Sequence, residues 1–379
     1  MRDTVVIGGG PAGSMAARLL APDRDVLVIE EHSCSGEPVQ CAGLLTDEVL
    51  SLSGVRTEVL NRIYGANVFF PGGGAITVRS KKPKVNVIDR AELDRLMAEK
   101  AMDAGAEYRY GERYLSHTVS NRISVKTDSG TEDCSLLIGA DGHSSRTAMT
   151  LGDNRPREYI RGYQMDVRKT SGEEDMINIR LGSETAPGFF SWEVPFEDCI
   201  RVGLCTSWSA GPPWNYMKKL LAETGLDKAP AVKKYCGKIP LGGRPRSYGD
   251  RLMLIGDAAG QVKPVSAGGL HPAFKSAPFL KKTADEAFAS DDFSAKVLSR
   301  YEKGWKKETG KELRRGYALR KAFKKMSDSD LDKAYGLATS DSVLNALNDI
   351  DFDRPSSVIE NVPKRDLIRF LPFALKVIF

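Results

Sequence analysis

The stretch Gly8-Gly9-Gly10-Pro11-Ala12-Gly13 decides the fold of this chain. It follows the short apolar run Thr4-Val5-Val6-Ile7, which predicts a buried strand, and it precedes residues 14–20, whose apolar side chains recur at helical spacing. A second buried strand is predicted at residues 25–29 and ends at Glu30-Glu31. Strand, glycine turn, helix, strand and acid within about 30 residues form the dinucleotide-binding pattern. The chain is therefore predicted to begin with a Rossmann-like unit.

Each part of this pattern has a physical role in holding a dinucleotide. Gly8 permits the tight turn, Gly10 lets the backbone approach the pyrophosphate, and Gly13 lets helix and strand pack closely. The helix N-terminus offers free N–H groups and a positive dipole end to the phosphates. The acid that ends the second strand accepts hydrogen bonds from ribose hydroxyls, and we expect only one residue of Glu30-Glu31 to face the ribose. This motif alone does not separate NAD from FAD.

Two later glycine segments favour FAD. Gly139-Ala140-Asp141-Gly142 follows a predicted strand at residues 135–138, and Gly256-Asp257 follows another at residues 251–255. In FAD folds of the glutathione-reductase type, an Asp in the place of Asp257 holds the ribityl chain. Asp141, Gly142 and Gly256 are also expected to contact the cofactor. Gly260 and the pair Gly268-Gly269 then bring backbone N–H groups toward the pyrophosphate or the flavin pyrimidine ring. The three segments together predict FAD as the cofactor.

Composition limits the other classes of function. The chain has 379 residues, of which 41% are hydrophobic, enough for one large or two medium domains. It shows no signal peptide and no run of the roughly 18 apolar residues that a membrane span needs. No CxxC or Cys/His spacing suggests a metal site, and only four His are present. The six cysteines are scattered and indicate free thiols in a reducing cytoplasm: Cys34, Cys41, Cys134, Cys199, Cys205 and Cys236.

Segments of the cofactor-binding type alternate along the chain with other segments, which include runs of short strands. This predicts an α/β fold with an α+β insert. We expect a Rossmann-like FAD-binding domain assembled from residues 1–60, 80–155 and 240–290. Short strands within residues 156–206, and a hairpin around Pro71-Gly72-Gly73-Gly74, predict an inserted antiparallel-sheet substrate domain of residues 61–79 and 156–239. Within the first domain, Asp89 is the expected N-cap of a helix. Residues 291–379 are predicted to form a helical C-terminal region.

This order of segments resembles the FAD monooxygenase-type fold of p-hydroxybenzoate hydroxylase and, within it, the archaeal branch of the geranylgeranyl reductase family. Gly36-Glu37-Pro38-Val39-Gln40-Cys41-Ala42-Gly43 resembles the family's cysteine-containing loop beside the isoalloxazine. Residues 187–195, Pro-Gly-Phe-Phe-Ser-Trp-Glu-Val-Pro, resemble its substrate-pocket pattern Pro-x-x-Tyr-x-Trp-x-Phe-Pro. Phe190 stands where the family has Tyr, and Val194 where it has Phe. The ring and the apolar character remain, but the phenol hydroxyl is lost.

The resemblance implies a set of site residues. It implies FAD contacts from Ala12, Glu31, Cys41, Ala42, Arg90, Asp257, Gly269 and Leu270, with a further backbone contact near Tyr114. It implies substrate contacts from Pro187, Phe190, Trp192 and Pro195. Cys41 is the candidate proton donor, and its alternative role is that of a small residue packed beside the ring. Arg90 suits the pyrophosphate as a cation, and its alternative role is that of a charge on a helix surface.

The activity implied by the resemblance is reduction of C=C bonds in geranylgeranyl chains of archaeal ether-lipid precursors, with hydride from reduced flavin N5 and a proton to the other carbon. Such chains are recognised by burial, at about 25 cal/mol per Å². Strand alternation predicts Phe190 and Trp192 on one face and Phe189 on the other. One alternative is an electron-transfer flavoprotein that passes electrons to a partner. Another is a flavin hydroxylase or halogenase, the latter disfavoured because no Trp-x-Trp-x-Ile pattern is present.

Charge suggests the partners. The net charge is +5, and residues 296–325 carry twelve Lys or Arg against three Glu, with Trp305, Tyr317 and Phe323 interleaved. Anionic phospholipid or an acidic electron carrier fits this stretch better than nucleic acid does, and a solvated helix face is the alternative. The reductant is left open among ferredoxin, NAD(P)H and a deazaflavin. The tail at residues 368–379 could dip into one leaflet or dock on the protein's own core, so we expect a cytoplasmic protein with possible peripheral contact to the inner face of the membrane.

Overall fold

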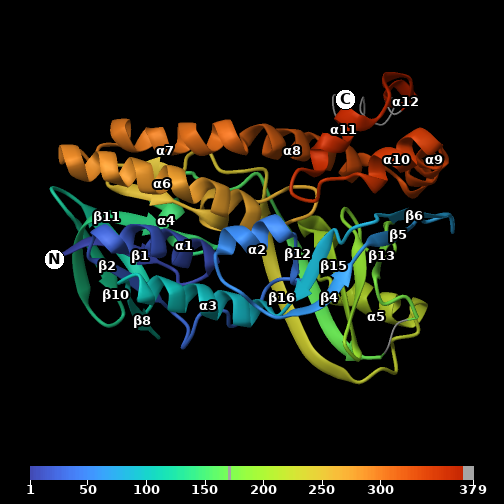
Figure 1. The fold of residues 1–379 in the computed structure, drawn as a ribbon, viewed down its shortest axis with the longest axis horizontal. Coiled ribbons are helices and arrows are strands. Elements are labelled where there is room, and N and C mark those ends of the chain that lie inside the picture. Colours follow the sequence, from blue (N-terminus) through green and yellow to red (C-terminus); the bar gives the residue numbers. More distant parts are fainter. Residues whose placement is uncertain (170–171, 370–379) are drawn as a thin grey trace.

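The protein is described by a computed structural model that covers residues 1–169 and 172–369. Its strands form sheets of eight, seven and three strands. In Figure 1 the eight-stranded sheet lies toward the N-terminal end of the elongated molecule and the seven-stranded sheet toward the other end, with long helices along one side. The predicted tail lies mostly outside the described residues.

The eight-stranded sheet follows the order β17-β18-β11-β1-β2-β8, and β10 and β9 continue it as an antiparallel extension of β11. β1 pairs in parallel with β11 and β2, β2 with β8, and β11 with β18. Its strands are β1 (Arg2–Ile7), β2 (Val26–Glu30), β8 (Glu107–Tyr110), β9 (Tyr114–Val119), β10 (Ile123–Thr127), β11 (Thr131–Gly139), β17 (Tyr248–Gly249) and β18 (Leu252–Leu254).

Both faces of this sheet are buried, which explains why its strands read as continuous apolar runs. In β1, Val6 points into the core beneath the helices, and Val5 and Ile7 point into a second core beneath the β9–β10 hairpin. The covering helices are α1 (Pro11–Leu20), α2 (Asp47–Ser53), α3 (Arg90–Asp103), α6 (Leu270–Ser290) and α7 (Ala295–Glu308), with the short α4 (Arg146–Met149) and the 3₁₀ turns η1 (Ala21–Asp23) and η3 (Gly256–Ala259). The Asp89 side chain accepts from the Ala91 N–H and caps α3, as predicted.

The seven-stranded sheet has the order β16-β12-β15-β14-β13-β5-β6. It is antiparallel except for β5 and β13, which pair in parallel. The predicted antiparallel sheet is found apart from this pair, which is parallel because β5 and β13 are joined by a long crossover through the other sheet and not by a hairpin. Its elements are β5 (Gly65–Phe69), β6 (Ala75–Arg79), β12 (Glu158–Arg168), β13 (Met176–Arg180), β14 (Ser191–Phe196), β15 (Cys199–Ser207), η2 (Trp208–Ala210), α5 (Trp214–Glu223) and β16 (Ala231–Leu241).

A small sheet, β3-β7-β4, lies where the chain passes between the two larger sheets. Its strands are β3 (Leu44–Leu45), β4 (Val59–Ile63) and β7 (Val85–Ile88). Strands of the eight-stranded sheet thus come from separated stretches of chain, with the seven-stranded sheet inserted between them. The predicted fold class is confirmed.

The C-terminal helices extend over the second sheet (Figure 1). Ile76 of the edge strand β6 packs against Ala338, Val343 and Ala346 from these helices. Each helix in the described ranges is too short or too polar to cross a bilayer. The elements are α8 (Gly310–Lys325), α9 (Asp328–Ala338), α10 (Asp341–Asn348), η4 (Pro355–Ser357), α11 (Val358–Asn361) and α12 (Lys364–Arg369).

Candidate functional site

The glycine turn after β1 has the shape that a dinucleotide requires. A Cβ on Gly8, whose φ is 100°, would lie 2.4 Å from the Ala140 carbonyl oxygen, and one on Gly13 would lie 1.9 Å from the Gly8 oxygen. A Cβ on Gly10 would meet no heavy atom within 4 Å. Gly10 precedes α1 and no side chain caps this helix, so its first N–H groups face the open space. The turn thus has no room for a side chain at Gly8 or Gly13, whereas the position at Gly10, near Ala12, is free of protein atoms of the described residues.

The structure distinguishes the two acids at the end of β2. Glu30 is buried, and its Oε2 accepts from the Gly9 N–H at 2.7 Å. Its Oε1 accepts from the His32 N–H at 2.9 Å and lies 2.6 Å from His32 Nδ1. Glu31 follows the strand and is exposed. Glu30 therefore belongs to the glycine turn, whereas Glu31 lies outside it.

Asp141 has its carboxylate engaged by the protein itself. Oδ1 accepts from the Ser145 and Thr147 hydroxyls at 2.6 and 2.5 Å, and Oδ2 accepts from the Thr147 N–H at 2.9 Å. The side chain thus orders the turn into α4, and Gly142 has φ 69° and an open Cβ position. A Cβ on Gly8 would meet Ala140 and one on Gly256 would meet the Ala12 Cβ at 2.7 Å, so the three glycine segments meet in one region, which we call the crevice. Tyr114 is buried at the start of β9, and its carbonyl accepts from Arg146 Nη1 at 3.3 Å.

The third glycine segment brings Asp257 into the same crevice. Burial raises the pKa of Asp257 to about 6, and the positive charges of Arg90 and Arg244 oppose that rise. A Cβ on Gly269 would come within 2.9 Å of Asp257 Oδ1, so the two residues are in contact. Gly269 precedes α6, which begins at Leu270 without a capping side chain, and Gly268 stands against Lys263. Two uncapped helix N-termini, of α1 and α6, thus border one crevice.

Sequence reasoning missed two buried side chains at this crevice. Gln261 Oε1 accepts from the Gly256 N–H at 2.8 Å, and its Nε2 donates to Tyr301 at 3.0 Å, which fixes the turn before Asp257. Arg244 donates to the carbonyls of Asn154 and His143, but its buried Nε has no hydrogen-bond partner among the described residues. The unpaired Nε, the uncapped helices and the open position at Gly10 fit an anionic dinucleotide.

Arg90 is buried, so the alternative of a charge on a helix surface is wrong. Its guanidinium binds Asp94, with Nη2 at 2.9 and 3.1 Å from the two carboxylate oxygens. It also interacts electrostatically with Cys41 and Asp257. One buried cation thus joins the cysteine loop to the third glycine segment.

The loop that carries Cys41 and Ala42 is held by the seven-stranded sheet. Gln164 Nε2 of β12 donates to the Cys41 carbonyl at 2.7 Å, and Arg201 Nη1 of β15 donates to the Ala42 carbonyl at 2.8 Å. Asp166 accepts from Arg201 Nε at 2.7 Å and from the Tyr235 hydroxyl at 2.7 Å. These partners are buried, so the loop is fixed from one side by a connected polar network.

The predicted aromatic residues lie together, but the arrangement differs from strand alternation. Phe189 and Phe190 stack with ring centroids 4.3 Å apart, and Phe190 meets Trp192 edge-on at 6.2 Å. Phe189 is therefore not on an opposite face, because residues 187–190 precede β14, where alternation begins. These three rings, which we call the aromatic cluster, pack with Val262 and Ala267 from the third glycine segment.

The two prolines of the predicted pocket are separated. Pro187 starts the segment, and its carbonyl accepts from the Ser207 N–H at 2.9 Å. Pro195 lies inside β14, and alternation places its ring on the opposite face from Trp192. The structure therefore brings Pro187, Phe190 and Trp192 into one region and leaves Pro195 away from it.

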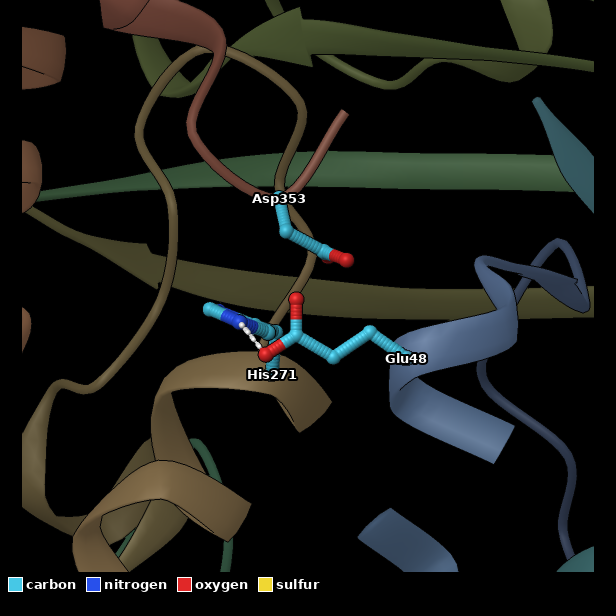
Figure 2. A group of neighbouring side chains, drawn as sticks. All are labelled: Glu48, His271 and Asp353. Atoms are coloured by element: carbon cyan, nitrogen blue, oxygen red, sulfur yellow. Dashed lines mark ion pairs between the residues drawn. The ribbon is translucent and has the colours of Figure 1, made fainter. Parts of the chain in front are cut away.

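A cluster of ionisable groups borders the cofactor segment. Glu48, His271 and Asp353 converge from α2, the first turn of α6 and the C-terminal segment (Figure 2), with ligand atoms within 4.8 Å of one another. Lys263 Nζ donates to Asp353 at 3.0 Å and to the Phe352 carbonyl at 2.8 Å. Glu48 meets His271 at 3.5 Å and Lys275 at 3.3 Å. Because each carboxylate already has a lysine, we interpret the cluster as an ion-pair network that fastens the C-terminal segment to the cofactor loop.

The crevice and its glycine segments define an FAD-binding protein. Residues 1–194 match the family described as FAD binding domain, so FAD is the cofactor. Over 87% of its length the chain is 31% identical to digeranylgeranylglycerophospholipid reductase 2 of Methanothermobacter thermautotrophicus, covering 90% of that protein. It is 30% identical to the protein of the same name from Methanopyrus kandleri, over 87% of this chain and 88% of that one. The chain belongs to the digeranylgeranylglycerophospholipid reductase family, which confirms the resemblance.

Solved structures share the fold. A geranylgeranyl bacteriochlorophyll reductase-like protein from Thermoplasma acidophilum superposes with a TM-score of 0.86 at 23% identity, over 98% of this chain and 99% of that one. The flavin-dependent halogenase CmlS gives a TM-score of 0.70 at 17% identity, over 98% of this chain and 77% of that one. At these identities the likeness concerns the fold alone.

Proposed function

We propose that the protein is an FAD-dependent oxidoreductase that reduces C=C bonds in the geranylgeranyl chains of archaeal membrane ether-lipid precursors. The relatives at 30% and 31% identity are both named reductases of digeranylgeranylglycerophospholipid. This favours a reductase over an electron-transfer flavoprotein or a monooxygenase of the same fold. Two electrons and two protons are consumed for each double bond, and the electrons come from an external donor, of the ferredoxin, NAD(P)H or deazaflavin class.

The observation that carries the proposal is the continuity between the aromatic cluster and the cofactor loop. Phe189, Phe190 and Trp192 pack with Val262 and Ala267, which lie between Asp257 and Gly269. An isoprenoid chain offers almost no polar group, so it must be held by apolar contact, and aromatic rings supply large apolar faces. A chain laid on this cluster lies beside the cofactor segment, and the cluster excludes water there.

The residues of the crevice would hold the cofactor. Bound FAD, when reduced, supplies hydride. The N–H groups after Gly10, with Ala12 and Gly13, would bind the pyrophosphate, and Glu30 the ribose. Asp257 would bind the ribityl chain, and the backbone at Gly269 and Leu270 would contact the ring system.

Cys41 is the proton donor that we propose. Its thiol lies between Arg90 and the Gly43 N–H, which donates to Sγ at 3.4 Å. Gln164 and Arg201 donate to the Cys41 and Ala42 carbonyls, so hydrogen bonds hold the backbone that follows the thiol-bearing carbon. A Cys41→Ser variant that retains FAD but loses lipid reduction would support this role, and one with unchanged turnover would refute it.

The test of the proposed function is mass spectrometry of lipids from cells that make this protein together with a geranylgeranyl ether-lipid pathway and a low-potential electron donor. Each reduced double bond adds about 2 Da, from one hydride and one proton. Mass gains that disappear with Asp257→Ala would support the reductase. Unchanged lipids, with FAD bound and the donor present, would instead favour electron transfer to a partner protein.

A further inference from the structure

Exposed aromatic rings gather on the face of the seven-stranded sheet opposite the Cys41 loop. Tyr159, Arg161 and Tyr163 alternate along β12 and share that face, whereas Gln164 and Asp166 point the other way. Trp208 is 50% exposed and Trp214 is 40% exposed. Soluble proteins seldom leave two large rings this exposed on one patch without a partner.

Cations hold these rings in place. The Arg161 guanidinium lies 3.9 Å from the Trp208 ring centroid, and Lys238 Nζ lies 4.9 Å from that of Tyr159. Tyr159 meets Trp208 at 6.3 Å, and Tyr163 meets Trp214 edge-on at 5.5 Å. Neither Arg161 nor Lys238 forms an ion pair with any described residue. The patch is thus aromatic and positively charged, and no described carboxylate neutralises these two cations, so they can also meet an anionic surface.

The basic helices α7 and α8 differ from this patch in the burial of Trp305 and in the pairing of several of their cations. Trp305 is buried in the core, and several of their cations are already paired, such as Arg300 with Glu286 and Arg315 with Glu360. Tyr317 and Phe323 of α8 are half-buried, whereas Trp208 and Trp214 are exposed, so the most exposed rings beside cations lie on the sheet.

The patch adjoins the aromatic cluster. Trp208 follows Ser207, whose N–H donates to the Pro187 carbonyl at 2.9 Å. The same segment continues to Phe190, whose carbonyl accepts from the Cys205 N–H at 3.2 Å. The segment of residues 187–190 therefore runs along the end of β15 from the exposed patch to the rings beside the cofactor loop.

We propose that the surface formed by Tyr159, Arg161, Tyr163, Trp208, Trp214 and Lys238, here called the docking patch, binds an anionic phospholipid bilayer. Trp and Tyr rings favour the headgroup level, where one side of the ring is apolar and the other wet. Lys and Arg beside them meet lipid phosphates. This proposal rests on the proposed function: binding through the docking patch would place residues 187–190 at the membrane that holds the lipid substrate.

The experiment measures binding of the FAD-loaded protein to vesicles of phosphatidylcholine, with and without phosphatidylglycerol, by flotation. We expect binding that depends on phosphatidylglycerol and weakens about fivefold for each cation removed in Arg161→Gln and Lys238→Gln. Trp208→Ser with Trp214→Ser should abolish it. Vesicles with brominated acyl chains should quench the tryptophan fluorescence of the unaltered protein and not that of the double variant.

Two matched controls remove the same chemistry elsewhere. Lys303→Gln with Lys307→Gln removes two exposed cations of α7, and Leu115→Ser with Val119→Ser removes two exposed apolar side chains of β9. Neither control should change flotation. Docking-patch variants that float like the unaltered protein would overturn the proposal. So would variants that keep vesicle binding but lose affinity for a reduced ferredoxin used as an acidic probe.

Reduction of a detergent-dispersed geranylgeranyl lipid separates this proposal from the proposed function. We expect the docking-patch variants to reduce the dispersed lipid normally and to lose reduction only in vesicles. If the protein reduces neither dispersed nor vesicle lipid but flotation depends on the docking patch, membrane binding by the patch is supported and the proposed function is refuted. If dispersed lipid is reduced and the docking-patch variants float like the unaltered protein, only membrane binding by the patch is refuted.

Discussion

Alanine at Gly10 and at Gly13 should have opposite consequences, although the two glycines belong to one motif. A Cβ at Gly13 would lie 1.9 Å from the Gly8 carbonyl oxygen and 3.2 Å from the Ala140 Cβ, so α1 would have to move away from the sheet. We expect this to destabilise the FAD-free protein by about 1–3 kcal/mol, as overpacking does. A Cβ at Gly10 meets no protein atom within 4 Å, and φ there is −71°, which Ala adopts freely. The FAD-free Gly10→Ala protein should therefore lose at most about 1 kcal/mol.

The methyl group at position 10 would instead occupy the approach of the pyrophosphate. Loss of one hydrogen bond to a charged group costs about 1.5–3 kcal/mol, or roughly a tenfold to hundredfold weaker Kd. Titration of FAD-free protein with FAD, followed by flavin fluorescence, measures the affinity, and thermal unfolding by circular dichroism measures the fold. Gly10→Ala with unchanged FAD affinity, or Gly13→Ala with unchanged FAD-free stability, would refute the assignment of these two roles.

Three further predictions concern the crevice, the polar network and the aromatic cluster. Burial keeps the pKa of Asp257 near 6, above its ordinary value, so the carboxylate destabilises the FAD-free protein above that pH, by no more than about 3 kcal/mol, and the effect vanishes below about pH 4. Asp257→Asn should therefore raise the urea midpoint at about pH 8 and leave it unchanged near pH 4, and an equal shift at both would contradict this. Asp166→Ala should cost about 3–5 kcal/mol in urea unfolding because it leaves Arg201 buried and unpaired, against about 1 kcal/mol for Tyr235→Phe; equal losses would argue against the ion pair. Phe190→Ala should lower kcat/KM for dispersed lipid roughly tenfold to hundredfold without changing FAD affinity, and weaker FAD binding would place the ring in the cofactor site instead.

The glycine motif could be predicted because its requirements are local. Gly8, Gly10 and Gly13 lie in one turn at a recurring spacing, which identifies them, although Gly8 also meets Ala140 of the middle segment. The choice between Glu30 and Glu31 could not be made in the same way. It depends on where β2 ends, and the pairing of β2 with β8 continues through Glu30. The contact of Asp141 with the cofactor stays a prediction, and the role that its carboxylate has in the protein itself, accepting from Ser145 and Thr147, could be expected from the spacing of a capped turn.

The polar network behind Cys41 could not be predicted, because its members lie more than 100 residues from the loop they hold. One signal was present. Asp166 stands between Met165 and Val167, and Arg201 stands between Ile200 and Val202; a charge between buried apolar neighbours requires a partner. The register places Asp166 directly opposite Arg201 between β12 and β15, but that pairing is a property of the folded sheet.

The two departures from the family's substrate pattern fall in different environments, and under the proposed function only Phe190 would contact the substrate. Val194 is fully buried among Ile63, Val85 and Ile177 on the face of β14 that packs against the small sheet, where a smaller side chain changes core packing. Phe190 stacks on Phe189 in an apolar cluster that also holds Val262 and Ala267, so the missing hydroxyl would change the surface on which we propose that the lipid chain lies. The loss of that hydroxyl leaves the cluster more apolar, with the Trp192 indole N–H as the polar group of its three rings. Specificity of this protein for the position of the double bond should therefore rest on the shape of the cluster and not on a hydrogen bond from residue 190.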